Sequence, residues 1–83
     1  MAQNYPNPFN PETNISYQLA KGDYVTLKIY DLLGNEIATL VNEYKPQGKY
    51  YIKFDASNIA SGIYVYGLRV NGFSSFGKLM LLK

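Results

Sequence analysis

The acid–base chemistry open to this chain rests on its carboxylates, because the sequence contains neither histidine nor cysteine. Histidine is the side chain that titrates near neutral pH, and the cysteine thiolate is both a nucleophile and a zinc ligand. Asp31 and Glu36 flank one predicted turn, and Asp55 opens a loop that also contains Ser57. A catalytic carboxylate pair must face a cleft at about 5–10 Å. Hydrogen bonds that cap turns would account for these carboxylates without any catalytic cleft. The sequence therefore predicts that the chain is not an enzyme.

Oxygen ligands for a metal ion gather in the loop at residues 55–62, DASNIASG. The side chains of Asp55 and Asn58, with loop carbonyl groups, could hold Ca²⁺, but the alternating acidic ligands of a calcium loop are missing. Side chains of these types also bond the nearby backbone of a loop. The sequence therefore predicts no metal site and no cofactor.

Charge gives little basis for binding a nucleic acid. The chain has 83 residues with 8 basic and 6 acidic side chains, a formal net charge of +2, and no run of like charge. Binding to a phosphate backbone depends on many Lys and Arg contacts, so no nucleic-acid partner is predicted. The excess charge lies in residues 71–83, which contain Lys78 and Lys83 and no acid.

Hydrophobic composition indicates one folded domain. Apolar residues make up 47% of the chain, which is too high for disorder, and no run of about 20 apolar residues could span a bilayer. An aromatic content of 16% favours short, twisted strands packed on each other.

Apolar and polar residues alternate with a period of two along most of the chain, which predicts β-strands. A further strand is expected at residues 37–41, ending at the polar Asn42 and Glu43, and a last one at residues 73–83. Asn71-Gly72 suits a type I′ hairpin turn between the last two strands, and Ile59 is expected to be buried under its loop. The inward positions of the clearest strands are Ile15, Tyr17 and Leu19; Val25, Leu27 and Ile29; Tyr50, Ile52 and Phe54; and Tyr64, Tyr66, Leu68 and Val70.

Turns that recur about every ten residues predict an all-β fold, a small antiparallel immunoglobulin-like β-sandwich of about seven strands. We expect a single domain over residues 1–83, with an extended proline-rich arm at 1–12 and the sandwich body at 13–83. Proline fixes φ and makes its predecessor extended, so NYPNPFNPET is expected to be a stiff arm. Tyr5 and Phe9 are candidates to anchor it.

Three tyrosines fall on the solvent side of their predicted strands: Tyr24, Tyr30 and Tyr51. Exposed aromatic rings on a flat sheet can stack on sugar rings, as in carbohydrate-binding modules. Cross-strand pairing of aromatic side chains, which stabilises a sheet, explains the same pattern. The sequence leaves both interpretations open.

The last predicted strand also has two interpretations. It contains the apolar run at residues 79–82, and the sequence stops one residue later at Lys83. Such a strand can complete its own sheet, or it can offer backbone groups for β-strand addition by a partner.

Five short motifs, taken in order, resemble one known family. They are NYPNPFNPET with Ile15, Tyr17 and Leu19; VTLKIYDLLGNEIATLVNE; Gly48, Tyr50 and Phe54; DASNIASGIYVYGL; and KLMLLK. In order and spacing they are similar to the type A C-terminal sorting domain of the type IX secretion system of Bacteroidota and relatives. The resemblance covers residues 5–83.

The resemblance implies an immunoglobulin-like domain that labels an upstream cargo domain in the same chain. Such cargo crosses the inner membrane with a Sec signal peptide, and the outer-membrane type IX machinery recognises the folded domain. A sortase-like peptidase then removes the domain and can attach the cargo to surface lipopolysaccharide. The implied location is secreted or cell surface, reached through the periplasm and the outer membrane. The residues assigned to recognition by resemblance are Gly48, Tyr50, Gly62, Ile63, Tyr64, Lys78, Met80, Leu81, Leu82 and Lys83.

Two alternatives remain at this point. A carbohydrate-binding module would use Tyr24, Tyr30 or Tyr51 as a stacking surface. A structural adhesion module of a secreted multidomain protein would pair its last strand with another copy.

Overall fold

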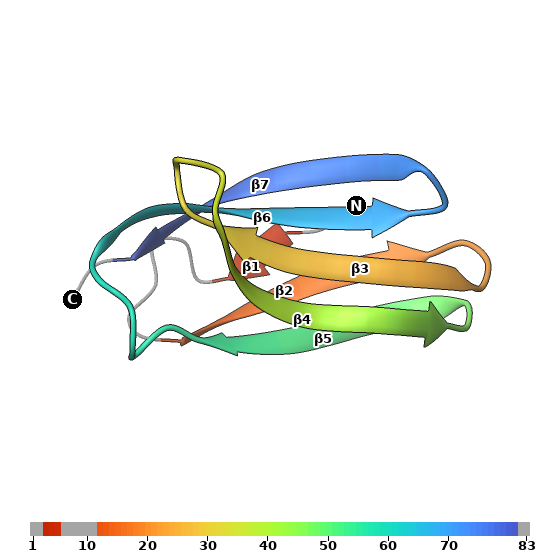
Figure 1. The fold of residues 1–83 in the computed structure, drawn as a ribbon. Coiled ribbons are helices and arrows are strands. Elements are labelled where there is room, and N and C mark those ends of the chain that lie inside the picture. Colours follow the sequence, from red (N-terminus) through yellow and green to blue (C-terminus); the bar gives the residue numbers. More distant parts are fainter. Residues whose placement is uncertain (1–2, 6–11, 82–83) are drawn as a thin grey trace.

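The predicted alternation appears as seven strands in a computed structural model, which describes residues 3–5 and 12–81 (Figure 1). Six strands are long and the first has three residues. Their bounds are β1 Gln3–Tyr5, β2 Glu12–Leu19, β3 Asp23–Tyr30, β4 Glu36–Lys45, β5 Gly48–Asp55, β6 Gly62–Val70 and β7 Phe73–Leu81.

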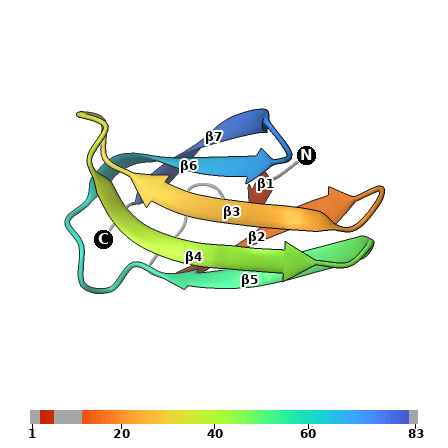
Figure 2. The ribbon, with the colours of Figure 1, turned by 45° about the vertical axis from the view of Figure 1, so that its right-hand side comes forward.

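The strands form two antiparallel sheets packed face to face, one in the order β1-β2-β5 and one in the order β4-β3-β6-β7 (Figure 2). The all-β, immunoglobulin-like sandwich predicted from the sequence is confirmed. In constant-type immunoglobulin domains the fourth strand joins the other sheet. Here the short connection at residues 31–35 keeps β4 beside β3.

Burial follows the predicted period of two, because successive side chains in a strand point to opposite faces of its sheet. The inward side chains of β2 and β3 are all buried, and both sheets contribute to one core. Ile59 is only partly buried and packs against the edge of this core. The fully buried apolar side chains, at 0% exposure, are Ile15, Val25, Leu27, Ile29, Ala56, Leu79 and Leu81.

The predicted hairpin turn between β6 and β7 is confirmed by its backbone angles. Asn71 has φ 48° and Gly72 has φ 84°, and a type I′ turn requires a positive φ at both central positions. Asparagine and glycine tolerate this region better than other residues.

The predicted end of the strand at residues 37–41, at Asn42 and Glu43, is wrong, because β4 continues to Lys45. Thr26 of β3 pairs with Asn42, and Val25 pairs with Glu43. Since β4 is an edge strand, its polar side chains stay in water while its backbone bonds to β3. Two register shifts along this pairing mark bulges.

The connections divide between the two ends of the sandwich (Figure 1). The turns after β2, β4 and β6 lie at one end, and the loops at residues 31–35 and 56–61 lie at the other with the end of β7. Of the proline-rich arm, Gln3–Tyr5 pairs with β2, and Phe9 lies outside the described residues. In the described part of the chain, no helix is long and apolar enough to span a bilayer.

Candidate functional site

Two of the segments that the resemblance assigned to recognition lie side by side at one end of the four-stranded sheet. Strand β6 starts at Gly62, and its first residues pair with the last described residues of β7. The register places Gly62 opposite Leu81 and Ile63 opposite Met80. The fold therefore brings these distant parts of the sequence into one surface, which we call the β6–β7 end.

The outer side of the β6–β7 end is apolar with one positive charge. Ile63 and Met80 are 36% and 37% exposed, and Lys78 is exposed beside them on the same side of β7. Lys78 makes no ion pair with the part of the chain that the structure describes. Leu81 points into the core instead. Leu82 and Lys83 lie outside the described residues.

Tyr64 holds the loop before β6. Its hydroxyl donates a hydrogen bond of 2.7 Å to the carbonyl oxygen of Ala60. A tyrosine near the start of the sixth strand that bonds back to the preceding corner is the tyrosine corner of immunoglobulin-like sandwiches. Gly62 has φ 152° with open space at its Cβ position, so its backbone angle favours glycine although no neighbour excludes a side chain.

Gly48 and Tyr50 lie at the opposite end of the sandwich, away from the other assigned residues. The Tyr50 hydroxyl donates to the carbonyl oxygen of Pro46 at 2.6 Å, and its ring stacks on Tyr17 with centroids 5.2 Å apart. Burial, and then the nearby Tyr50 and Glu43, raise the pKa of Tyr17. The structure thus gives Tyr50 a role in closing the turn after β4.

The three tyrosines considered for ligand stacking do not form one platform. Tyr24 and Tyr30 lie on the outer face of the four-stranded sheet, and Tyr51, 73% exposed, lies on the outer face of the other sheet. Tyr24 pairs across strands with Tyr44, and its hydroxyl donates to Asn42 Oδ1 at 2.6 Å. Tyr30 borders a groove described below.

The carboxylates near the turn after β3 are occupied by turn bonds. Asp31 Oδ1 accepts the backbone N–H of Asn35 and of Leu33, each at 2.9 Å. Hydrogen bonds from Asn35, first from its backbone, lower the pKa of Asp31. Glu36 accepts a hydrogen bond from the Thr39 hydroxyl at 2.7 Å and forms an ion pair with Lys28 at 3.0 Å. The pKa of Glu36 is lowered, and the hydrogen bond from Thr39 is the largest cause.

Asp55 also accepts a bond within its loop, from the backbone N–H of Ser57 at 2.9 Å. Among the described residues no group of three or more Asp, Glu, His or Cys side chains could hold a metal ion.

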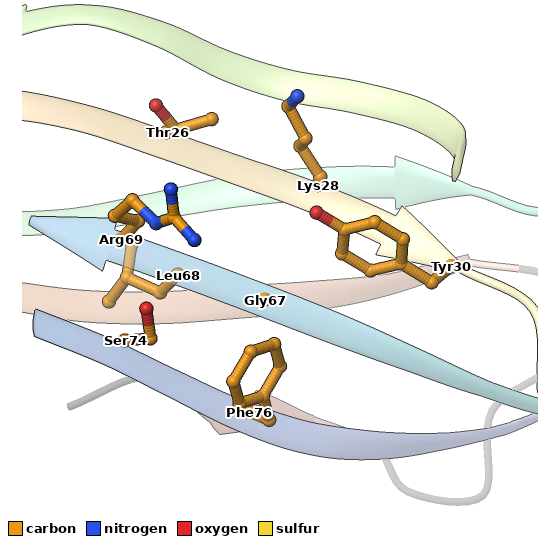
Figure 3. Close-up of a pocket in the computed structure, with 8 residues that line it drawn as sticks. All are labelled: Thr26, Lys28, Tyr30, Gly67, Leu68, Arg69, Ser74 and Phe76. Carbon is orange, nitrogen blue, oxygen red and sulfur yellow. The ribbon is translucent and has the colours of Figure 1, made fainter. Parts of the chain in front are cut away.

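The sequence patterns did not predict a groove that lies on the outer face of the four-stranded sheet. Figure 3 shows its lining side chains, which come from β3, β6 and β7. The one sequence signal was Gly67, because a glycine inside a strand often marks a close approach of another group. The lining residues are Thr26, Lys28, Tyr30, Gly67, Leu68, Arg69, Ser74 and Phe76.

Comparison with known proteins gives one match. A family model described as a secretion system C-terminal sorting domain matches residues 3–82, nearly the whole chain. A comparison with curated proteins found no match.

Proposed function

The chain belongs to the family of secretion system C-terminal sorting domains, and from this we propose that it directs an attached cargo through the outer membrane by type IX secretion. Domains of this family mark proteins that are secreted or displayed on the cell surface. The match over residues 3–82 is the observation that carries the proposal. The domain acts as a folded label and does no chemistry of its own.

The β6–β7 end is the surface that we propose the machinery reads. Strand β7 is the last strand of its sheet, and no described strand pairs with its outer side; a strand edge of this kind can pair with a partner strand. Beside this edge lie the exposed Met80 and Ile63 and the positive charge of Lys78. A partner could therefore combine backbone bonds with an apolar contact.

The other partners follow from the same proposal. The cargo is an upstream domain of the same polypeptide, and a sortase-like peptidase separates it from the label. Attachment of the released cargo to surface lipopolysaccharide completes the route.

A surface substitution tests the β6–β7 end better than a truncation. Removing residues 78–83 would also remove Leu79 and Leu81, which are fully buried, and loss of buried leucines costs about 2–5 kcal/mol each. Met80→Lys instead changes an outward side chain. Tyr44→Lys is the matched control, since Tyr44 is exposed on β4 at the opposite edge of the same sheet.

The experiment fuses a signal peptide, a reporter and each variant, and measures the reporter outside cells that have a type IX secretion system. Met80→Lys is expected to lower the secreted fraction about tenfold, the effect of about 1.4 kcal/mol of lost binding. Tyr44→Lys is expected to leave it unchanged, with circular dichroism showing both variants folded. Equal secretion by a folded Met80→Lys variant would refute this surface as the recognition site.

A further inference from the structure

The groove on the outer face of the four-stranded sheet lies over its inner strand β6 (Figure 3). It has a volume of about 190 Å³. Strand register explains its shape, since Lys28, Gly67 and Phe76 stand in one row across the sheet, and Thr26, Arg69 and Ser74 stand in the next. Gly67 has no side chain, so the rings of Phe76 and Tyr30 can lie close to its backbone.

The two aromatic rings lie on either side of Gly67 (Figure 3). A Cβ atom placed at Gly67 would lie 3.0 Å from Phe76 Cε1 and 3.1 Å from Tyr30 Cε2. Phe76 is nevertheless 65% exposed, so much of its surface still faces solvent. Aromatic faces next to a backbone floor provide a flat apolar contact for a ring-shaped ligand.

The polar lining of the groove consists of hydrogen-bond donors and positive charge. Thr26, Tyr30 and Ser74 contribute hydroxyl groups, and none of the described residues that line the groove carries a carboxylate. Lys28 is paired with Glu36 at 3.0 Å, so much of its charge is already neutralised. Arg69 is exposed and makes no ion pair with any residue that the structure describes. Its guanidinium group is suited to a carboxylate or a phosphate.

The position of the groove disfavours two other classes of ligand. Strand β6 is paired on both sides, with β3 and β7, so its backbone cannot bond to an extended peptide as a sheet edge can. The groove has two cations, one of them already paired, too few to follow a nucleic-acid backbone. Recognition must therefore come from side-chain donors and rings.

We propose that this groove binds a saccharide unit with an acidic group, with the sugar ring beside Tyr30 and Phe76 and the acidic group at Arg69. The hydroxyl groups of Thr26 and Ser74 bond to the sugar hydroxyls. This site is separate from the β6–β7 end and does not depend on secretion.

The test is an NMR titration of the isotope-labelled chain with trigalacturonate, with galactotriose as a neutral probe of similar size. Amide signals of Gly67 and Arg69 are expected to shift with trigalacturonate and not with galactotriose. Arg69→Gln is expected to weaken binding about tenfold, as loss of a charged hydrogen bond does. Phe76→Leu is expected to weaken it about threefold through loss of ring contact.

Each variant has a control on the outer face of the other sheet. Lys53→Gln removes an exposed charge from β5, and Tyr51→Leu removes an exposed ring; both are expected to bind trigalacturonate as the parent chain does. If Lys53→Gln weakened binding as much as Arg69→Gln does, the loss would reflect only a general attraction between opposite charges. That result would overturn the proposal.

Two further outcomes would also overturn it. Sodium phosphate that shifts the same signals with the same affinity would mean a site for a simple anion. The signals of Gly67 and Arg69 could also stay unshifted up to roughly 10 mM trigalacturonate. Any dissociation constant would then be above roughly 10 mM, which is too weak for recognition, and there would be no saccharide site.

Discussion

Two tyrosines close connections of this fold with the same bond, from the hydroxyl to the carbonyl oxygen four residues earlier. Tyr50 bonds to Pro46 at 2.6 Å, and Tyr64 bonds to Ala60 at 2.7 Å. Both residues belong to motifs that resemblance assigned to recognition. Their hydroxyls point back to their own loops, so at the residue scale these motifs contain structural bonds as well as exposed groups.

Tyr64→Phe removes the hydroxyl and keeps the ring. We expect the free energy of unfolding to fall by about 1 kcal/mol, the net value of one hydrogen bond. Urea unfolding measures the change. Tyr51→Phe is the control, because Tyr51 is exposed and its hydroxyl bonds to no described residue, and a change within about 0.5 kcal/mol is expected. Equal losses in the two variants would contradict the role given to the Tyr64 bond.

Asp31 makes the stability of the turn after β3 depend on pH. Its pKa is lowered in the folded state, first by the backbone N–H of Asn35 and then by the Asn35 side chain. A lowered pKa means that the ionised carboxylate stabilises the fold above its ordinary pKa and loses this effect as pH falls. The parent chain is therefore expected to exceed Asp31→Asn in stability at neutral pH.

Unfolding measured from neutral pH to about pH 3, below the ordinary carboxyl pKa near 4, should show the two chains converging on acidification. A gap that stays constant or widens as pH falls would contradict this assignment.

At the scale of elements, the pairing of β6 with β7 includes a close contact between Tyr66 and Gly77. The two residues are register partners, and a Cβ added at Gly77 would overlap the Tyr66 ring. Tyr66 is buried in the core, so its ring has little room to move, and burial raises the pKa of its hydroxyl.

Gly77→Ala is therefore expected to lower the free energy of unfolding by about 2–3 kcal/mol, as overpacking of a core does. Gly22→Ala is the matched control, since its Cβ would crowd the end of the exposed Tyr44 side chain, which can move, and would lie in ordinary contact with the Lys45 carbonyl oxygen at 3.4 Å. Its effect is expected to stay below about 1 kcal/mol. Thermal or urea unfolding compares them, and a Gly77→Ala chain as stable as the parent would contradict the packing argument.

Local pattern predicted most strands because burial on one face imposes a period of two. Val25, Leu27 and Ile29 show this alternation. The residue types of Asn71-Gly72 were enough to predict the turn between the last two strands. The extension of β4 beyond Asn42 could not be predicted, because its polar side chains are compatible with an edge strand and with a loop.

The surfaces were less predictable than the strands, because they depend on register between distant segments. Tyr30, Arg69 and Phe76 line one groove only because β3, β6 and β7 are neighbours with a particular alignment. The family motifs indicated the β6–β7 end by resemblance, but its shape as one surface needed the pairing of Ile63 with Met80.

At the scale of the whole molecule, the sandwich presents two separate surfaces on one sheet. The β6–β7 end combines a strand edge that no described strand covers with exposed apolar side chains, and the groove over β6 combines rings with the charge of Arg69. The core that supports both is shared by the two sheets. A label read as a folded domain should therefore lose function when this core is disturbed.

Secretion of a fused reporter tests this account most directly. A signal peptide and reporter are expressed with or without the chain, in a host with a type IX secretion system and in the same host with that system inactivated. We predict that the reporter leaves the cell only when the chain is attached and the system is intact. A reporter that stays in the periplasm of the intact host with the folded chain attached, or that leaves the inactivated host equally well, would contradict the assignment of this domain as a sorting signal.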